Sequence, residues 1–287
     1  MPCTVCVINL KGGVGKTTLT VALAEFLAEE FGKRVLAIDV DPQTNLTVSL
    51  IPDQEWENRN KAGQTLCQLF KDKLDRTSIF NVNSSIVKGV SNLHGGIARL
   101  DLLPSSIDFI QIQDQLVNIG AGTYYTIAPA SVLHDAIASV LDSYDFVLID
   151  CPPNLGIVTF NALAISDYFL IPVIPDVLST HGIPQILTRV SDFNRSGSHN
   201  VQPLGIVISL FRTQIDIHHS TIERLRSEAK GGRFPRVFDT VIPNMSAAAA
   251  SVDVTSSPNT LKQKYGYGKS YDVYRDVVKE FLSYVKI

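Results

Sequence analysis

One stretch decides the fold of this chain: Lys11-Gly12-Gly13-Val14-Gly15-Lys16-Thr17-Thr18. The apolar, β-branched run at residues 4–9 predicts a buried strand before it, and apolar residues at helical spacing over 19–27 predict a helix after it. Three closely spaced glycines let the backbone turn its N–H groups toward one point, and the helix N-terminus adds partial positive charge there. The sequence therefore predicts a phosphate-binding loop.

Three side chains at the end of this loop have the chemistry that a nucleoside triphosphate requires. Lys16 would reach the β- and γ-phosphates, the Thr17 hydroxyl would ligate Mg²⁺, and Thr18 would contact the α-phosphate. A glycine-rich turn without a ligand is the alternative, and the position between a strand and a helix disfavours it. We therefore expect ATP and Mg²⁺ as cofactors.

Composition indicates an ordinary globular protein. The chain has 287 residues, of which 45% are hydrophobic and 18% charged. No Pro/Gly/Ser-rich linker divides it, so we expect one domain over residues 1–287. The longest apolar runs are far below the ~20 residues that cross a bilayer, and no basic region precedes an apolar stretch at the N-terminus. A cytoplasmic protein without a membrane partner is expected.

The loop departs from the usual phosphate-loop pattern in one way. Leu10 stands where a glycine is expected, and Lys11 follows it. This resembles the deviant Walker A motif of the ParA/MinD family of ATPases, Lys-Gly-Gly-x-Gly-Lys-Thr-Thr. The resemblance implies that Lys11 reaches across a dimer interface to the nucleotide held by the partner subunit. It thus implies an ATP-dependent homodimer in which Lys11 acts with Lys16 in catalysis.

Two further strands are predicted to end in carboxylates. The strand at 33–39 leads into Asp39-Val40-Asp41-Pro42-Gln43, and the strand at 143–150 ends in Asp150, which is the Walker B pattern. Such carboxylates lie near the metal and the γ-phosphate when their strands flank a phosphate loop. The resemblance implies that Asp41 orients the attacking water and Asp39 supports the Mg²⁺ shell, while Asp150 would hold a Mg²⁺-bound water. A turn in which Asn45 caps the next helix is the alternative for this stretch.

Strands and helices alternate along the remainder of the chain. Further strands are predicted at 100–104, 168–173 and 204–210, and helices at 66–74, 154–165, 183–193 and 271–285, with Ser105 or Ser106 capping another that runs through Leu116. This alternation predicts an α/β fold, a doubly wound, mostly parallel sheet with helices on both faces. Residues 239–244 match the family's strand-to-loop element beside adenine, which makes Pro243, Asn244 and Met245 candidate base contacts.

Four cysteines are present: Cys3, Cys6, Cys67 and Cys151. Cys3 and Cys6 fall where the side chains of a buried strand should lie. A redox or metal site at this pair is the alternative, but small buried thiols are the favoured interpretation.

Net charge is −3, so nucleic-acid binding would need a local basic patch. The candidate DNA-binding residues are Arg212, Arg224, Arg226, Lys230, Arg233 and Arg236, with Lys262, Lys264 and Lys269 following nearby. A solvated charged helix is the alternative, because Glu223 and Glu228 interleave. The family often carries arginines just after the adenine element, where this chain has Ser246 and four alanines.

Within the family, the partition branch fits best. No cysteine lies where an iron protein would hold its cluster, and the last predicted helix lacks the basic face of a lipid-binding MinD anchor. The resemblance implies a nucleoid-associated ATPase that binds DNA non-specifically, is stimulated by a ParB-like partner or cargo adaptor, and positions plasmids, chromosomes or carboxysomes. The alternatives are a MinD-like positioning ATPase or a small-molecule kinase or ligase of the dethiobiotin synthetase type.

Overall fold

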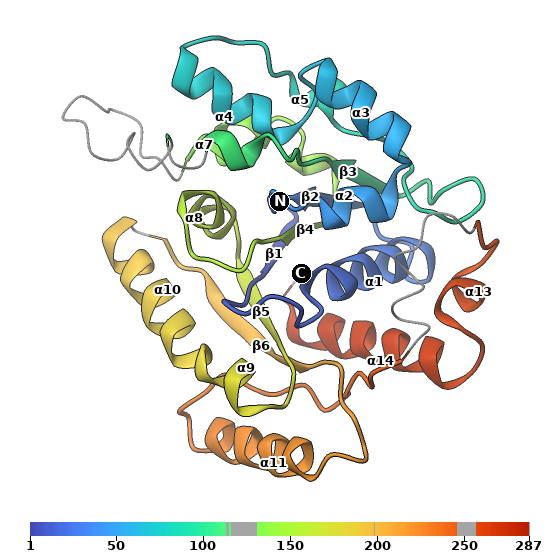
Figure 1. Ribbon diagram of the computed structural model, residues 1–287, viewed down its shortest axis with the longest axis vertical. Helices are drawn as coiled ribbons and strands as arrows, with labels where there is room; N and C mark the ends of the chain where they lie inside the picture. The colour runs from blue at the N-terminus through green and yellow to red at the C-terminus, as the bar shows by residue number, and fades with distance from the viewer. Residues whose placement is uncertain (113–114, 116–130, 198, 246–256, 287) are drawn as a thin grey trace.

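Six parallel strands form the centre of the molecule (Figure 1), in the order β3-β2-β4-β1-β5-β6. A computed structural model describes the chain except residues 113–114, 116–130, 198, 246–256 and 287. The strands are β1 (Cys3–Val7), β2 (Val35–Asp39), β3 (Leu100–Leu103), β4 (Phe146–Asp150), β5 (Tyr168–Val173) and β6 (Gln202–Ile208). All of their carboxyl ends therefore lie at one edge of the sheet.

Side chains of each strand alternate between two apolar layers. On β1, Val5 and Val7 pack into one layer, whereas Cys6 packs into the other together with Ile8 just beyond the strand. Because helices cover both faces, the strands are apolar throughout instead of alternating apolar with polar residues. This explains why they appear in the sequence as short continuous apolar runs.

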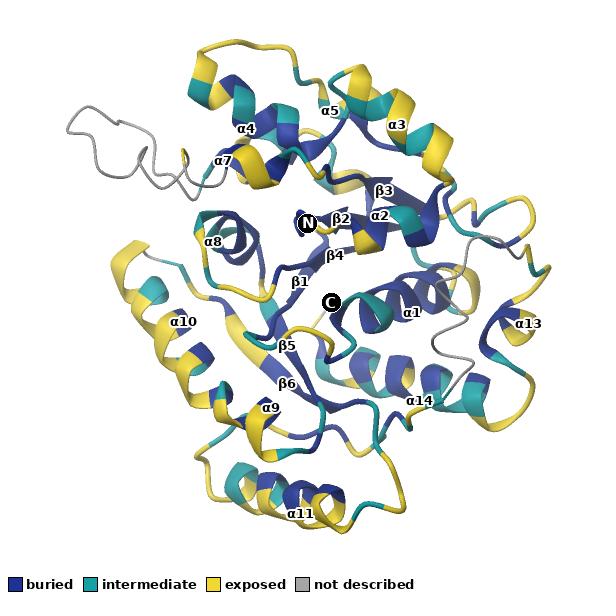
Figure 2. Ribbon diagram, in the orientation of Figure 1, coloured by how far each residue is buried: buried dark blue, intermediate teal, exposed yellow. Residues whose placement is uncertain are grey.

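One helical layer combines helices from the N-terminal and C-terminal parts of the sequence. It holds α1 (Lys16–Glu29), α2 (Asn45–Leu50), α13 (Leu261–Tyr265) and α14 (Lys269–Tyr284). The opposite layer holds α4 (Leu66–Asp75), α7 (Val132–Ile137), α8 (Ile157–Ala164), α10 (Ile183–Gly197) and α11 (Asp216–Lys230). The shorter or peripheral elements are α3 (Asp53–Lys61), α5 (Val82–Ser85), α9 (Val177–His181) and the 3₁₀ turn η1 (Leu141–Ser143). Figure 2 shows the buried side of each main helix turned to the sheet.

The predicted fold class is confirmed, and several local expectations are refined. Thr44, not Asn45, is the N-cap of α2, and Asn81 caps the short helix α5. The segment at 239–244 forms only a bridge, Phe211 to Pro243, in place of a strand. Ser106 accepts a hydrogen bond from the Asp108 N–H, but Leu116 lies outside the described residues.

All four cysteines are buried and unpaired, as expected for core thiols. In the described part of the chain, no helix has the length and apolar character needed to cross a membrane.

A buried ion pair fastens the C-terminal segment to α1. The Lys264 ammonium lies 2.7 Å from a carboxylate oxygen of Glu25, and both side chains are at most 1% exposed. The hydroxyls of Ser91 and Tyr265 also donate to this carboxylate, at 2.5 and 2.8 Å. Lys264 is therefore part of the core, and its placement near a DNA-facing patch was wrong.

Removing Lys264 should destabilise the protein strongly. Lys264→Ala leaves the Glu25 carboxylate buried without its counter-charge, which typically costs about 3–5 kcal/mol of unfolding free energy. Lys262→Ala is the matched control, because Lys262 is exposed and lies 5.4 Å from the centre of the Tyr271 ring, a contact worth about 1 kcal/mol or less. Urea unfolding of both variants is the measurement. Equal losses would contradict the assigned role of the pair.

Candidate functional site

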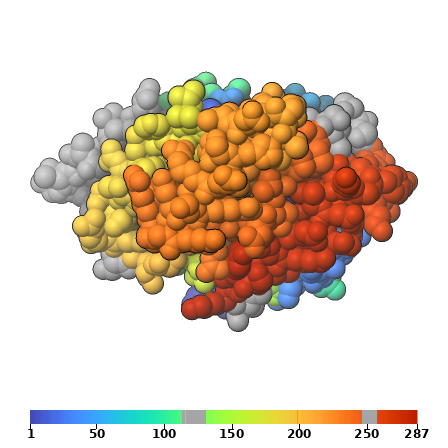
Figure 3. All heavy atoms as spheres, turned by 90° about the horizontal axis from the view of Figure 1, so that it is seen from below, coloured from blue at the N-terminus to red at the C-terminus, as the bar shows by residue number. Residues whose placement is uncertain are grey.

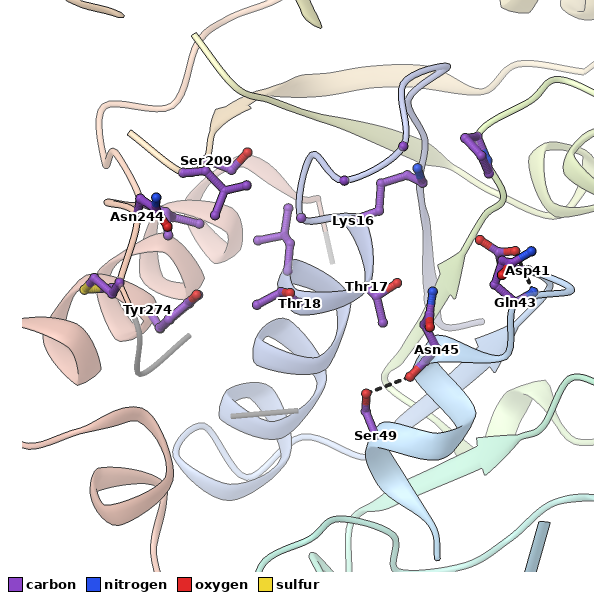
Figure 4. Close-up of a pocket in the computed structure, with 18 of the residues that line it drawn as sticks. Lys16, Thr17, Thr18, Asp41, Gln43, Asn45, Ser49, Ser209, Asn244 and Tyr274 are labelled. Atoms are coloured by element: carbon purple, nitrogen blue, oxygen red, sulfur yellow. Dashed lines mark hydrogen bonds between the residues drawn. The ribbon is translucent and has the colours of Figure 1, made fainter. Parts of the chain in front are cut away.

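A cleft of about 600 Å³ opens at the carboxyl edge of the sheet. It brings together most of the predicted nucleotide-site residues, as Figure 4 shows for those that it labels. Those that line it are Gly12, Gly13, Gly15, Lys16, Thr17, Thr18, Asp41, Asn244 and Met245. Five predicted residues do not line this cleft: Lys11, Val14, Asp39, Asp150 and Pro243.

The loop between β1 and α1 is held in a fixed shape. Gly13 and Gly15 have φ angles of 72° and 81°, a left-handed conformation that side-chain-bearing residues rarely adopt. The Asn9 amide donates to the Pro172 carbonyl at 2.7 Å and its oxygen accepts from the Lys11 N–H at 2.9 Å. The Ser209 hydroxyl donates to the Val14 carbonyl at 2.7 Å. The loop is thus anchored to β5 at its start and to the end of β6 at its middle.

The Lys16 side chain lies inside this loop. Its ammonium is 3.4 Å from the Asn9 carbonyl and 3.3 Å from the Lys11 carbonyl, and the residue is 7% exposed. Burial lowers the pKa of Lys16, while the carboxylates of Asp150 and Asp41 act in the opposite direction. A cation held in this way, beside loop N–H groups, is suited to binding an anion such as a polyphosphate.

The Thr17 hydroxyl and Asp150 are brought together at the start of α1. Thr17 Oγ1 donates to Asp150 Oδ2 at 2.6 Å, and the Thr20 hydroxyl lies 3.4 Å from Oδ1. Burial raises the pKa of Asp150 to about 7; the hydrogen bond from Thr17 opposes this, and the charge of Asp41 adds to it. An alcohol and a carboxylate at this spacing are oxygen donors of the kind that Mg²⁺ prefers.

The two carboxylates after β2 have different surroundings. Asp39 is fully buried, and it accepts from the N–H and hydroxyl of Thr47 at 2.9 and 2.7 Å and from the Asp41 N–H at 3.0 Å. Asp39 therefore fixes the turn that carries Asp41. Asp41 accepts from the Gln43 N–H at 2.9 Å and lines the cleft. Burial raises the pKa of both carboxyls, most strongly for Asp39.

Lys11 points away from this cleft. Its ammonium lies 3.2 Å from Asp176 Oδ2 and 2.9 Å from the Ser179 hydroxyl, at the start of α9. Asp176 also accepts from the Ser179 N–H and caps that helix. The lysine side chain is 35% exposed, and two neighbouring apolar residues, Val177 and Leu178, are 49% and 75% exposed. The first lysine of the loop thus lies on an open face of the molecule.

Two of the three predicted base contacts, Asn244 and Met245, line the cleft, and Asn244 lies at the end opposite Asp41 (Figure 4). With its amide oxygen turned toward Arg212, Asn244 accepts two bonds from that guanidinium at 2.8 and 3.0 Å. The Met245 sulfur accepts from the Ser270 hydroxyl at 3.0 Å, which ties this segment to α14. Pro243 does not line the cleft and is instead bridged to Phe211.

The predicted DNA-binding cations lie on α11 and in the turn after it, except Arg212, which precedes the helix and donates to Asn244 at the cleft. Most have contacts within the protein. Arg224 donates to the Thr180 hydroxyl at 3.2 Å and Arg226 to the Asp239 carbonyl at 3.0 Å. Arg233 lies 3.7 Å from Glu228, and Arg236 stacks over the Tyr284 ring at 4.3 Å. Lys230 is exposed at the end of α11.

Several residues of the site carry no clear signal in the sequence. Asp176 and Ser179 hold Lys11, Ser209 holds the loop, and Tyr274 lines the cleft from α14. Only Asp176 could have been suspected, since it follows a predicted strand at the same edge of the sheet. Across the described residues, no group of three or more His, Cys, Asp or Glu side chains could hold a metal by itself. A cation here would need the hydroxyl of Thr17, and water or phosphate oxygens, to complete its shell.

Comparison with known proteins gives the family. Residues 3–202 match the AAA domain family. The chain is 29% identical over 279 residues to the sporulation initiation inhibitor protein Soj of Bacillus subtilis, covering 96% of each chain. It is 30% identical over 240 residues to the chromosome partitioning protein ParA of Myxococcus xanthus, covering 83% of this chain and 74% of that protein.

Solved structures share the fold. Cobyrinic acid a,c-diamide synthase of Mycobacterium smegmatis, with a bound ATP analogue and magnesium, superposes with a TM-score of 0.73 at 23% identity, covering 98% of this chain and 94% of that one. Apo McdA of Cyanothece also gives 0.73, at 21% identity, covering 98% and 100%. A structure of the former enzyme with bound ADP and magnesium is similar in fold as well, with a TM-score of 0.71 at 24% identity. By its sequence likeness to ParA and Soj, the chain belongs to the ParA family of partition ATPases.

Proposed function

We propose that this chain binds Mg²⁺-ATP in the cleft between α1 and the 243–245 segment, and that two copies close face to face around two nucleotides. The closed dimer binds DNA without sequence preference. Hydrolysis, stimulated by a ParB-like partner or a cargo adaptor, opens the dimer and releases the DNA. Repeated cycles would position a plasmid, a chromosome or another cargo on the nucleoid.

The position of Lys11 carries this proposal. Its backbone belongs to the phosphate loop, yet its ammonium lies at the start of α9 and does not line the cleft. Val177 and Leu178, which lie in the chain between the two residues that contact the ammonium, expose apolar side chains. A second copy placed against this face would cover that surface and receive the lysine on its own phosphates.

Hydrolysis is assigned to groups already fixed in the cleft. Lys16 would neutralise charge on the transferred phosphoryl group, and Asp41 would orient the attacking water. When bound, Mg²⁺ would neutralise phosphate charge from the side of Thr17 and Asp150, and Asp39, whose oxygens accept from Thr47 and Asp41, would support this shell by fixing the turn that carries Asp41. The loop that carries Lys16 and the turn that carries Asp41 are both held by buried hydrogen bonds.

DNA binding is assigned to the surface of α11. Figure 3 shows the segment that contains α11, in orange, spread across one face of the molecule between α10 and α14. Arg224 and Arg226 each make one hydrogen bond within the protein, and Arg233, just after the helix, makes one surface ion pair; phosphate oxygens can replace such single contacts. One such patch on a chain of net charge −3 binds weakly, and joining two patches in a dimer raises the avidity without new contacts.

Lys11→Ala should abolish dimerisation. Without its ammonium, nothing from this loop reaches the partner's phosphates, so we expect the variant to bind ATP and sediment as a monomer when the unaltered protein sediments as a dimer. Asp176→Ala is the control, since it removes only the partner of Lys11 within the same subunit, and it should dimerise at equal or lower ATP concentration. Analytical ultracentrifugation with Mg²⁺-ATP decides between them. A dimer of Lys11→Ala would show that another group bridges the subunits.

Cations of α11 should govern DNA affinity alone. We expect Arg224→Ala with Lys230→Ala to keep the ATP-dependent dimer and to weaken duplex binding at least severalfold. The slope of log affinity against log salt should become shallower by about 0.9 for each phosphate that the variant no longer neutralises. Lys61→Ala is the control, because α3, which carries this exposed lysine, lies at the opposite end of the molecule from α11 (Figure 1). An unchanged slope in the double variant would place the DNA surface elsewhere.

The same assays separate this proposal from a small-molecule kinase or ligase. A partition ATPase should turn over ATP faster when DNA and a partner protein are added. A metabolic enzyme would instead respond to a small substrate and not to DNA.

A further inference from the structure

Tyr274 is a buried side chain whose polar end faces the nucleotide cleft. It lies on α14, is 2% exposed and lines the cleft together with Thr18 and Met245. Its ring packs against Tyr265 with the centroids 5.0 Å apart, which fixes its direction. In Figure 4 the hydroxyl end of Tyr274 is directed from α14 toward Thr18.

This hydroxyl differs from those of the neighbouring tyrosines. Tyr265 donates to Glu25, Tyr271 to Glu30 and Tyr284 to Glu280. Within the described residues, the Tyr274 hydroxyl has no such acceptor, and burial is the only cause of the rise in its pKa. Buried tyrosine hydroxyls usually have a hydrogen-bond partner, so one that opens into a cleft is available to a ligand.

The place of Tyr274 in the cleft indicates which part of the ligand it meets. The proposed base contacts, Asn244 and Met245, lie at one end, and Thr18, assigned to the α-phosphate, lies nearby on α1. The Ser270 hydroxyl, one turn before Tyr274, donates to the Met245 sulfur and holds α14 against the base segment. The sugar of a nucleotide connects its base to its α-phosphate, so it must pass between these two groups.

We propose that the Tyr274 hydroxyl forms a hydrogen bond with a sugar hydroxyl of the bound nucleotide, so that the site selects ribonucleotides over sugar-deoxygenated analogues. This inference rests on the proposed function, since it assumes that the cleft binds an adenine nucleotide. A neutral phenol suits a neutral sugar hydroxyl, because it can both donate and accept. Its raised pKa keeps it protonated throughout the physiological range.

The test compares ADP with 2′,3′-dideoxy-ADP by calorimetry in the presence of Mg²⁺. ADP is chosen because it undergoes no turnover. The unaltered protein should bind the dideoxy analogue roughly threefold to tenfold more weakly, the effect of one lost neutral hydrogen bond. Tyr274→Phe should bind the two nucleotides with equal affinity, at the level that the unaltered protein shows for the analogue.

Tyr265→Phe is the matched control. It also removes one buried hydroxyl from the same aromatic cluster, but that hydroxyl donates to Glu25 and not into the cleft. It should lower the unfolding temperature and keep the preference for ADP. Tyr274→Phe should keep its unfolding temperature, since no bond within the described protein is lost.

Two results would overturn the inference: a Tyr274→Phe protein that keeps the full preference for ADP, or an unaltered protein that binds both nucleotides equally. Failure of the unaltered protein to bind ADP or ATP at all would overturn the proposed function, and the sugar contact with it.

Discussion

Replacing Lys16 with alanine is expected to lower the affinity for ATP and ADP by about 100-fold or more, since each charge-assisted hydrogen bond contributes roughly 1.5–3 kcal/mol and the ammonium would reach two phosphates. Lys11 does not supply this cation, because its ammonium lies at the start of α9 and its side chain does not line the cleft. The fold should survive the change. Asp150, whose pKa burial already raises to about 7, can take up a proton when the neighbouring cation is removed.

Calorimetry with Mg²⁺-ADP and Mg²⁺-ATP is the measurement for Lys16→Ala, with circular dichroism to confirm folding. Lys61→Ala, which changes an exposed lysine on α3, should bind both nucleotides normally. If Lys16→Ala bound both nucleotides with unchanged affinity, the loop between β1 and α1 would not be the phosphate site.

Replacing Asp41 with asparagine should reduce the rate of ATP hydrolysis by about 100-fold or more and leave nucleotide affinity within a few-fold. The amide keeps the shape of the side chain and can still accept from the Gln43 N–H, which holds the carboxylate at 2.9 Å. It cannot accept a proton from water as a carboxylate can. Since Asp41 is proposed to act on the attacking water, its loss should appear in turnover and not in ground-state binding.

The Asp41→Asn protein should therefore accumulate as an ATP-bound dimer on DNA. Single-turnover hydrolysis and DNA binding, measured on the same preparation, check both parts. Asp53→Asn at the start of α3 is the control and should hydrolyse ATP at the normal rate. Normal turnover in Asp41→Asn would show that another group orients the attacking water. Asp39 is poorly suited to that role, because its carboxylate already accepts hydrogen bonds from Thr47 and Asp41.

Much of the nucleotide cleft could be predicted from local sequence. The glycines and Lys16 lie within one loop, and Asp41 and Asp150 follow apolar strands, so strand ends alone place them at one edge of a parallel sheet. The strand predicted at residues 168–173 has the observed bounds. These features are encoded over a few consecutive residues each, which is why periodicity reveals them.

Contacts between distant segments could not be predicted in this way. Lys264 looks like any lysine on a basic stretch, yet a carboxylate 239 positions earlier makes it a core residue. Tyr274 belongs to an apolar helical stripe, and the sequence shows no difference between a stripe residue in the core and one whose hydroxyl opens into a cleft. The arginines form one basic stretch in the sequence, whereas helix geometry directs Arg224 toward Thr180 and Arg226 toward Asp239.

The strand order also dictates when the phosphate loop can acquire its shape during synthesis. β1 is made first, but its neighbours in the sheet are β4 and β5, and Cys3 pairs with Phe146. The emerging loop therefore lacks both Asp150 and the Pro172 carbonyl that fixes Asn9 until more than half of the chain has been translated. Such long-range pairing slows folding. Nucleotide cannot act as an early template, and a ribosome-bound chain should gain ATP affinity only after β5 has left the exit tunnel.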